Sequence, residues 1–264
     1  QNVTVQNFVI EKYDPTIQDG AIQGGQGWTI QDNEVRLNYA VGIIGVDSSK
    51  LIGNYVHDNG QMGLGGFGDN ILVQGNEIAK NGYWSGIDVL WEGGGFKYAD
   101  TQKLVVRGNY SHDNNGIGMW TDIDNIHTLY EDNVVVHNGM GGISHEISYD
   151  AIIRNNIILG SGIGLQRHQA GSPSNQIVAH NTVIGAGISV RNVSGSVVVD
   201  TGNTSGFGTV ENPPMIAVYT SAYTPAHPTH AGIQAQSIAY SLDHGQTWTK
   251  YSGNPVLDRG SANF

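Results

Sequence analysis

Short apolar segments broken by Asn, Asp or Gly recur along the chain as far as residue 192. The segment on each side of such a break is only a few residues long and rich in β-branched residues, as in TIQDNEVRL, ILVQGNEIA, KLVVRGNYS and AIIRNNIIL. Runs this short do not form amphipathic helices, and β-branched residues favour extended backbone. The pattern therefore predicts many short β-strands joined by tight corners.

Two sets of positions repeat in phase through this part of the chain. An Asn followed by a hydrophobic-rich pair recurs at Asn33, Asn54, Asn76, Asn109, Asn133, Asn156 and Asn181. A Gly followed by an apolar residue recurs with it, at Gly42, Gly63, Gly86, Gly118, Gly142, Gly164 and Gly187. Repetition in phase at a period of about 22 residues predicts a solenoid of stacked β coils.

Asparagine suits the recurring corner of such a coil. It tolerates the left-handed backbone conformation, and its amide can hydrogen-bond along the axis to the next coil. A short period with an Asn ladder resembles the right-handed parallel β-helix of the pectate-lyase-like superfamily. The resemblance covers residues 1–192 and implies an all-β, right-handed parallel β-helix of about seven to eight coils. That superfamily includes lyases, hydrolases, epimerases, adhesins and phage spikes, so the resemblance implies a fold and leaves the chemistry open.

The coil registers stop after residue 192. The segments SGSVVVDTGNTSGFG, PPMIAVYTSAY, QAQSIAYSLDHGQTWTKYSGNPVLD and SANF follow in order. They resemble the N-terminal blades of the fructosidases of glycoside hydrolase family 32, which are five-bladed β-propellers. The resemblance implies a second domain over residues 193–264, with strands at about Ser196 to Asp200, Met215 to Thr220, Gln236 to Ser241 and Thr247 to Tyr251.

That family carries its nucleophile, transition-state stabiliser and acid/base in W-M-N-D-P-N-G, R-D-P and E-C motifs, none of which occurs in this chain. We therefore expect residues 193–264 to lack fructosidase activity by themselves. Their strands would miss their usual partners, so we expect them either to cap the last coil near Ile188 or to stay mobile. The chain is interpreted as a fusion or fragment in which the β-helix is the complete architecture.

Charge and composition exclude several classes of function. Twelve basic against 23 acidic residues give a formal net charge of −11, which argues against nucleic acid as a partner. No apolar run reaches the ~18 residues of a membrane span, so no membrane partner is expected. The absence of Cys excludes disulfides and thiol chemistry. No signal-peptide pattern stands at Gln1, and we expect a secreted, bacterial protein whose signal peptide is absent from this chain.

The Gly register predicts which side chains face outward. Like positions of successive coils stack ~4.8 Å apart, and alternate residues of a strand share a face. Counted from the buried apolar position, the outward positions become titratable only in the middle coils. This register predicts one face with Asp88, Asp122, Glu146 and His168, flanked near the strand ends by Asp124, His145 and Arg167.

The coil between Asn76 and Asn109 carries extra residues within GYWSGIDVLWEGGGFKY, which we expect to overhang this face. Aromatic side chains stack on sugar rings, and acids and bases act on the glycosidic bond. The composition therefore predicts a cleft for a polysaccharide or oligosaccharide. Its predicted substrate-binding residues are Trp84, Trp91, Trp120 and Lys97.

Carboxylate spacing distinguishes two forms of hydrolysis, neither of which requires a cofactor. Asp122 and Glu146 on adjacent coils are expected ~5 Å apart, as in a retaining pair. Asp88 and Asp122 are expected ~8 Å apart, as in an inverting pair. A glycoside hydrolase, acting on a fructan or another polysaccharide, is the leading hypothesis.

A polysaccharide lyase or epimerase is the first alternative. It requires a positive group to neutralise a uronate and a base close to it, for which Arg167 with His145 or His168 could serve. Because the chain is acidic, such an enzyme would need Ca²⁺ bridging Asp122, Asp124 or Glu146. The second alternative is a non-catalytic glycan-binding β-helix or adhesin.

Overall fold

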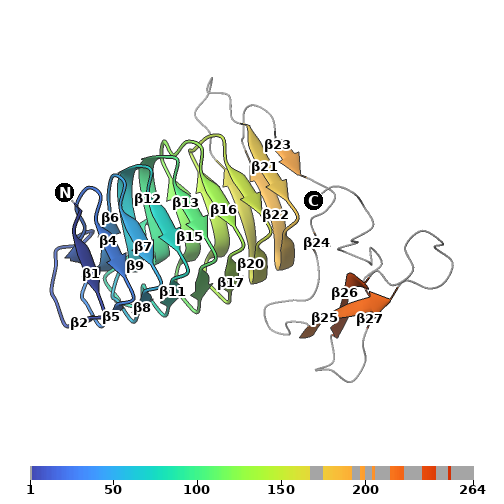
Figure 1. Cartoon of the computed structure of the whole chain (residues 1–264), viewed down its shortest axis with the longest axis horizontal. Helices are drawn as coiled ribbons and strands as arrows, with labels where there is room; N and C mark the ends of the chain where they lie inside the picture. The colour runs from blue at the N-terminus through green and yellow to red at the C-terminus, as the bar shows by residue number, and fades with distance from the viewer. Residues whose placement is uncertain are drawn as a thin grey trace. The chain divides into compact units, whose positions relative to one another are not determined.

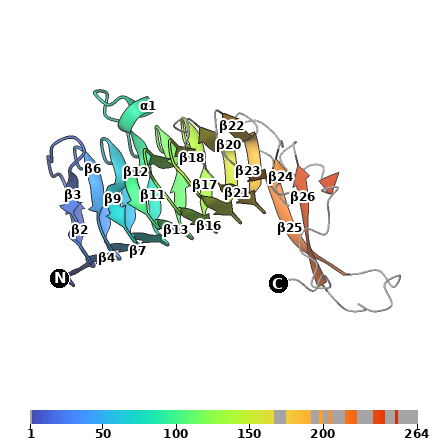
Figure 2. The same cartoon turned by 90° about the horizontal axis from the view of Figure 1, so that it is seen from above.

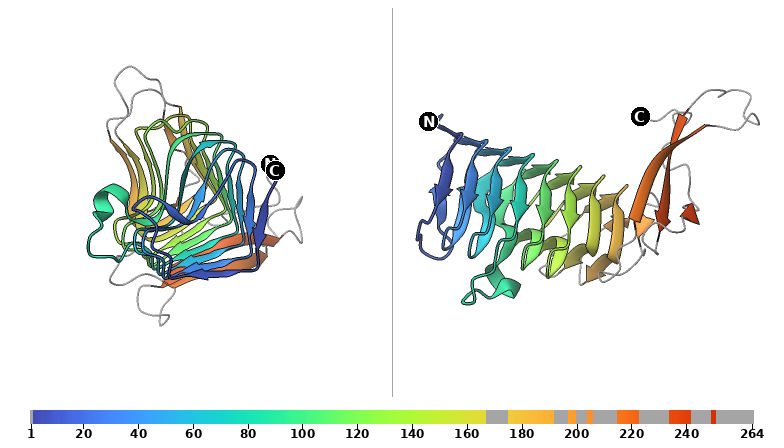
Figure 3. Two further views of the ribbon diagram at one scale, coloured as in Figure 1. Left: turned by 90° about the vertical axis from the view of Figure 1, so that its left-hand side faces the viewer. Right: turned by 90° about the horizontal axis from the view of Figure 1, so that it is seen from below.

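The computed structural model describes residues 2–166, 175–191, 197–199, 204–205, 215–222, 234–241 and 249–250. Contacts between Cα atoms divide the chain into two units, Gln1–Gly206 and Phe207–Phe264. The first unit is a stack of parallel β coils, which confirms the predicted all-β solenoid (Figure 1). In the view along the coils, the strands enclose one continuous interior (Figure 3).

The strands of the first unit form three columns, and each strand pairs in parallel with its counterparts in the neighbouring coils. The first column contains β1 (Thr4–Gln6), β4 (Thr29–Gln31), β7 (Lys50–Ile52), β10 (Leu72–Gln74), β13 (Val105–Arg107), β16 (Leu129–Glu131), β19 (Ile152–Arg154), β21 (Gln176–Ala179) and β23 (Val197–Val199). The second contains β2 (Val9–Glu11), β5 (Glu34–Arg36), β8 (Tyr55–His57), β11 (Glu77–Ala79), β14 (Tyr110–His112) and β17 (Val134–Val136). The third contains β3 (Gly20–Gln23), β6 (Val41–Gly45), β9 (Met62–Asp69), β12 (Gly94–Gln102), β15 (Ile117–Asp122) and β18 (Gly141–Glu146).

Two longer strands connect the second and third columns. β20 (Ile157–Gln166) pairs with β17 through its first half and with β18 through its second half. β22 (Thr182–Arg191) follows β20 along its whole length, and β24 (Thr204–Ser205) pairs with β22. The coils therefore continue as far as residue 205.

The corner between the first and second columns is held by the predicted Asn ladder. The residue before each ladder Asn adopts left-handed backbone, as Asp32 does at φ 53°. The Asn54 amide Nδ2 donates to Asn76 Oδ1 and to the Ile30 carbonyl, each at 2.9 Å. The same contact repeats between neighbouring coils along all seven predicted asparagines. Buried amides are thereby satisfied along the axis, as buried polar groups require.

A second Asn ladder, which the sequence analysis did not identify, holds the corner between the second and third columns. It consists of Asn38, Asn59, Asn81, Asn114 and Asn138. Each lies five residues after a member of the first ladder, so the repeat itself contained the signal.

Inward side chains of equivalent positions stack to form one apolar core. In the third column this row consists of Ile22, Ile43, Leu64, Phe96, Met119, Ile143 and Ile163. Burial of such side chains contributes roughly 1.5 to 3 kcal/mol each, which makes the interior the main source of stability.

Two coils have a different register from the predicted one. Gly95 with Phe96, and not Gly86, stands in the coil register, because Phe96 pairs with Leu64. In the next-to-last coil Ile163 pairs with Ile143, so Gly164 pairs with Ser144, two positions further along the strand than predicted. Both stretches contain several Gly-apolar pairs, and only the strand pairing selects among them.

Because the third-column strand of this coil begins later than the sequence predicts, residues 82–93 form an insertion between β11 and β12. It contains the short helix α1 (Val89–Glu92), which stands out from the coils beside β12 (Figure 2). Among the described residues, no helix is long and apolar enough to cross a membrane.

The second unit contains β25 (Met215–Ala222), β26 (Gln234–Ser241) and β27 (Thr249–Lys250), paired antiparallel in that order. Strands therefore occur at the three places where the family 32 resemblance implied them in this unit. The predicted cap on the last coil concerns residues that lie largely outside those the structure describes.

Candidate functional site

The outward face of the third column, beside the insertion, holds four of the predicted site residues: Lys97, Trp120, Asp122 and Glu146. In the register of the strands, Lys97 pairs with Trp120, and Trp120 with Ser144. Two positions further along, Asp122 pairs with Glu146, and Glu146 with Gln166. The structure thus brings Asp122 and Glu146 together on the adjacent strands β15 and β18.

Asp122 is held by a lysine that sequence reasoning had placed among the substrate-binding residues. Lys97 Nζ lies 2.8 Å from Asp122 Oδ2 and 3.9 Å from the centre of the Trp120 ring. It also donates to the Trp91 carbonyl at 2.6 Å, which ties the insertion to this face. Asp122 is only 6% exposed, and its Oδ1 has no hydrogen-bond partner within the described part of the chain. One oxygen of this carboxylate is therefore paired with the ammonium, and the other is buried without a partner.

Glu146 stands directly beside Asp122 and is 5% exposed. Gln166 Nε2 donates to its Oε2 at 3.3 Å. Neighbouring strands are ~4.8 Å apart, so two carboxylates at paired positions are close enough to act on one bond. The amide on Glu146 and the ammonium on Asp122 give the two acids different surroundings.

Asp88 does not join this face, contrary to the prediction. It precedes α1 in the insertion, where its side chain is exposed and accepts a hydrogen bond from the Leu90 backbone at 3.0 Å. The coil position predicted for it belongs to Lys97, because the register begins at Gly95. The predicted pair of Asp88 and Asp122 is therefore not formed.

His145 faces the interior of the coils, not the outward face that carries Asp122 and Glu146. It is fully buried, and its Nδ1 lies 2.7 Å from Thr121 Oγ1. Alternate residues of a strand point to opposite faces, so His145 shares the inward side with Ile143. From this side it cannot act as a base on a ligand bound outside. Arg167 and His168 lie outside the described residues.

Asp122 and Asp124 do not fit a calcium ion. The Asp122 carboxylate already contacts the Lys97 ammonium, and Asp124 lies in an exposed turn where it accepts a hydrogen bond from Tyr149 at 3.2 Å. Ca²⁺ needs six to eight oxygen ligands, and the described residues contain no group of three or more His, Asp or Glu that could hold a metal.

The three tryptophans occupy different environments. Trp91, on α1, is 65% exposed beside the face. Trp120 is 3% exposed beneath Lys97, so in this arrangement its ring supports the lysine and offers little surface to a ligand. Trp84 lies in another hollow, against Tyr39.

A cavity of about 370 Å³ lies between α1 and the third column. Trp91 and Lys97 line it, together with Gln18, Phe67 and Glu92, which the sequence analysis did not select. The Gln18 side chain hydrogen-bonds the Glu92 carboxylate, and Gln61 Nε2 donates to the Glu92 carbonyl at 3.1 Å. These hydrogen bonds thus hold the insertion against the preceding coils. No sequence signal marked Gln18, because it comes from a long corner without a repeat.

Comparison with known proteins gives two family matches. The sequence model of the right handed beta helix region matches residues 20–204, and that of the N-terminal domain of glycosyl hydrolases family 32 matches residues 187–264. The second match confirms the resemblance seen in the last segment of the sequence.

Similar proteins fall into the same two groups. The levanase of Bacillus subtilis is 55% identical over 64 residues, which cover 24% of this chain and 8% of the levanase. The extracellular exo-inulinase of Aspergillus niger is 46% identical over 80 residues, 28% of this chain and 15% of the inulinase. The chain thus spans a small part of the length of these relatives.

Among solved structures, the complex of XylC with xylose aligns with a TM-score of 0.53 and 19% identity, over 74% of this chain and 38% of that one. At this identity the likeness shows the fold alone. The β-helix match at residues 20–204 covers more than half of the sequence, and the strands it spans form the parallel coils described above. The chain therefore belongs to the right-handed β-helix family.

Proposed function

We propose that the β-helix is a secreted glycoside hydrolase and that Asp122 and Glu146 are its reacting carboxylates. The observation that carries the proposal is the direct pairing of these two acids on β15 and β18. Carboxyl groups ~5 Å apart suit a retaining mechanism, in which one acts as nucleophile and the other as acid and then base.

The surroundings of the two acids assign the roles. The Lys97 ammonium lies against Asp122 Oδ2, and Oδ1 has no partner within the described residues, so Asp122 would attack the anomeric carbon through Oδ1. Glu146, whose Oε2 accepts a hydrogen bond from the Gln166 amide, would protonate the glycosidic oxygen as the bond to the leaving sugar breaks. Glu146 would then take a proton from water, and the resulting hydroxide would release the sugar from Asp122.

A fructan is the first substrate to test. The segment at residues 187–264 is similar to the family 32 N-terminal domain, and the similar proteins include a levanase and an exo-inulinase. The similar exo-inulinase is extracellular, which agrees with the proposed secretion.

The test is a substrate screen with the whole chain. Levan, inulin, pectin, alginate and neutral glycans are incubated with the protein, and reducing ends and the absorbance of unsaturated products are measured. We expect reducing ends to rise without absorbance, and Asp122→Asn and Glu146→Gln each to lower turnover by about 10²-fold to 10⁴-fold. The matched control is Asp132→Asn, an exposed acid in a left-handed corner that Asn also tolerates.

Two outcomes would reject the assignment. Wild-type turnover in both variants would mean that the pair does not react. Unsaturated products would favour the lyase alternative, for which the interior position of His145 leaves Arg167 and His168 as candidates.

Non-catalytic glycan binding is the second candidate function. The observation in its favour is that both acids are nearly buried, as expected of groups that serve the fold. It predicts retention of a glycan without any release of reducing ends.

A further inference from the structure

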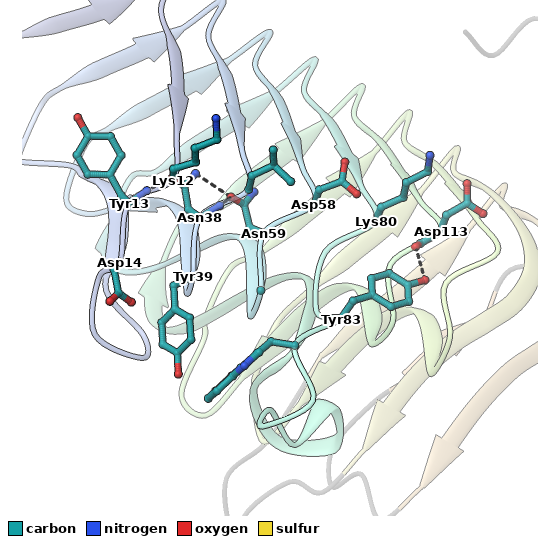
Figure 4. Close-up of a pocket in the computed structure, with 13 residues that line it drawn as sticks. Lys12, Tyr13, Asp14, Asn38, Tyr39, Asp58, Asn59, Lys80, Tyr83 and Asp113 are labelled. Atoms are coloured by element: carbon teal, nitrogen blue, oxygen red, sulfur yellow. Dashed lines mark hydrogen bonds between the residues drawn. The ribbon is translucent and has the colours of Figure 1, made fainter.

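A second hollow follows the corner between the second and third columns, away from Asp122 and Glu146. We call it the corner groove. It has a volume of about 1190 Å³ and extends along successive coils from Lys12 to Asp113 (Figure 4). It is lined by the left-handed residues that follow β2, β5, β8, β11 and β14, among them Asp58 and Lys80.

Aromatic side chains form one side of the corner groove. Tyr39 and Trp84 have ring centroids 4.5 Å apart and planes tilted by 59°, and both rings remain partly exposed. Tyr83, also from the insertion, is 60% exposed and donates from its hydroxyl to the Asp113 carbonyl at 2.9 Å. Figure 4 shows Tyr13, Tyr39 and Tyr83 at intervals along the groove. These are exposed ring faces at fixed positions, as sugar-binding sites require.

Two acids of the groove, Asp58 and Asp113, are positioned by histidines. His57 Nδ1 lies 2.6 Å from Asp58 Oδ2, its Nε2 lies 3.2 Å from Glu34 Oε1, and its ring stacks on Tyr55 at 3.9 Å. A carboxylate only accepts hydrogen bonds, so both contacts are hydrogen bonds when the imidazole is protonated. Asp58 is thereby fixed, and its exposed remainder can still accept hydrogen bonds from a ligand.

The same unit recurs two coils later. His112 lies 2.8 Å from Asp113 and 3.2 Å from Glu77, and its ring stacks on Tyr110 at 4.1 Å. Two coils correspond to roughly 10 Å along the axis, and Lys80 stands in the coil between the two acids. The groove thus presents an acceptor, a donor and an acceptor in three successive coils.

We propose that the corner groove binds a neutral polysaccharide lying along the axis of the β-helix. Exposed rings offer stacking surfaces, and fixed carboxylates accept hydrogen bonds from hydroxyl groups. Two lysines and three aspartates line the groove, so neither a polyanion nor a polycation is favoured by charge. A ligand with its own repeat fits positions that recur from coil to coil. The site would hold its ligand whether or not Asp122 and Glu146 catalyse a reaction.

The test is affinity electrophoresis of the whole chain in native gels that contain levan, inulin, neutral xylan or polygalacturonate. We expect at least one neutral polysaccharide to retard the protein. Trp84→Ala and Tyr39→Ala should each weaken the retardation about tenfold, because each removes a stacking surface. The matched control is Phe8→Ala, which removes an aromatic ring that is 59% exposed and does not line the groove.

Thermal melting of each variant is measured as a control, to check that the coils remain folded. The proposal is overturned if no neutral polysaccharide retards the protein, if both groove variants bind as the wild type does, or if polygalacturonate binds more tightly than every neutral glycan. Retardation is read without turnover, so loss of the proposed hydrolase activity leaves this test unaffected.

Discussion

A short chain of polar groups lies inside the coils, beneath the face that carries Asp122. The Tyr130 hydroxyl donates to Thr121 Oγ1 at 2.9 Å, and Thr121 Oγ1 lies 2.7 Å from His145 Nδ1. Burial raises the pKa of Tyr130, so its hydroxyl stays protonated and remains a donor. Tyr98, one coil earlier, is equally buried, but its hydroxyl has no hydrogen-bond partner among the residues described.

The two tyrosines therefore predict opposite effects of the same substitution. Tyr130→Phe removes a satisfied buried hydrogen bond and should lower the free energy of unfolding by about 1 to 2 kcal/mol. Tyr98→Phe removes an unsatisfied hydroxyl and should leave that free energy unchanged or raise it. Chemical denaturation of both variants measures the difference. Equal losses in the two variants would contradict this description of the interior.

His145 illustrates what the sequence could not provide at this scale. The sequence correctly placed its neighbours Ser144 and Glu146 on the outward face by counting from Ile143. It also placed His145, near the end of the strand, beside that face. The strict alternation of the strand continues to Glu146, which turns His145 inward. Only the observed length of the strand decides this point.

Among the elements, β13, β16 and β19 are joined on their outward side by one acid. Glu131 accepts hydrogen bonds from Arg107 on one side and from Arg154 on the other, at 2.6 and 2.9 Å for Arg154. Burial alone would raise the pKa of Glu131, but the hydrogen bonds from Arg154 and Arg107 outweigh it and hold that pKa below its usual value. This carboxylate thus links three successive coils in its ionised form.

Stability should depend on pH through this residue. Since the folded pKa of Glu131 is the lower one, its contribution is complete above the unfolded pKa and is lost as the pH falls through the folded pKa. We expect the melting temperature of the wild type to fall between about pH 5 and about pH 3, and Glu131→Gln to fall less steeply. Asp132→Asn, next in sequence and exposed, is the control. An acid slope of wild-type steepness in Glu131→Gln would contradict the role of this carboxylate.

The insertion at residues 82–93 explains why the strands were predicted more accurately than the residues of the face that carries Asp122 and Glu146. The Asn registers located the strands of the first two columns, because every coil has the same length between Asn and strand. The third column follows a corner of variable length, and the insertion carries its own Gly-apolar pair at Gly86. That pair displaced the predicted register, so Asp88 was assigned the place of Lys97.

For the whole molecule, the period of the sequence was sufficient to predict the β-helix, and the change of composition after residue 192 was sufficient to predict a second kind of structure. The predicted Asn register ends at Asn181, although pairing continues beyond it. β23 adds to β21 in the first column, and β24 adds to β22 in the second. Asn203 stands directly before β24, 22 residues after Asn181, and so continues the spacing of the Asn register. These strands lie after the last ladder Asn and before the boundary at Gly206.

The chain ending at residue 206 should therefore differ from a chain ending at residue 196. The longer form keeps β23 and β24 on the edges of β21 and β22, whereas the shorter form exposes the backbone donors and acceptors of both edges. Unpaired strand edges promote association between molecules, so we expect the 1–196 form to melt at a lower temperature and to aggregate more readily than the 1–206 form. Thermal melting and light scattering on both forms measure this. If the two forms melt and scatter alike, the short strands do not protect the end of the β-helix, and its stability comes from the ladders and the core alone.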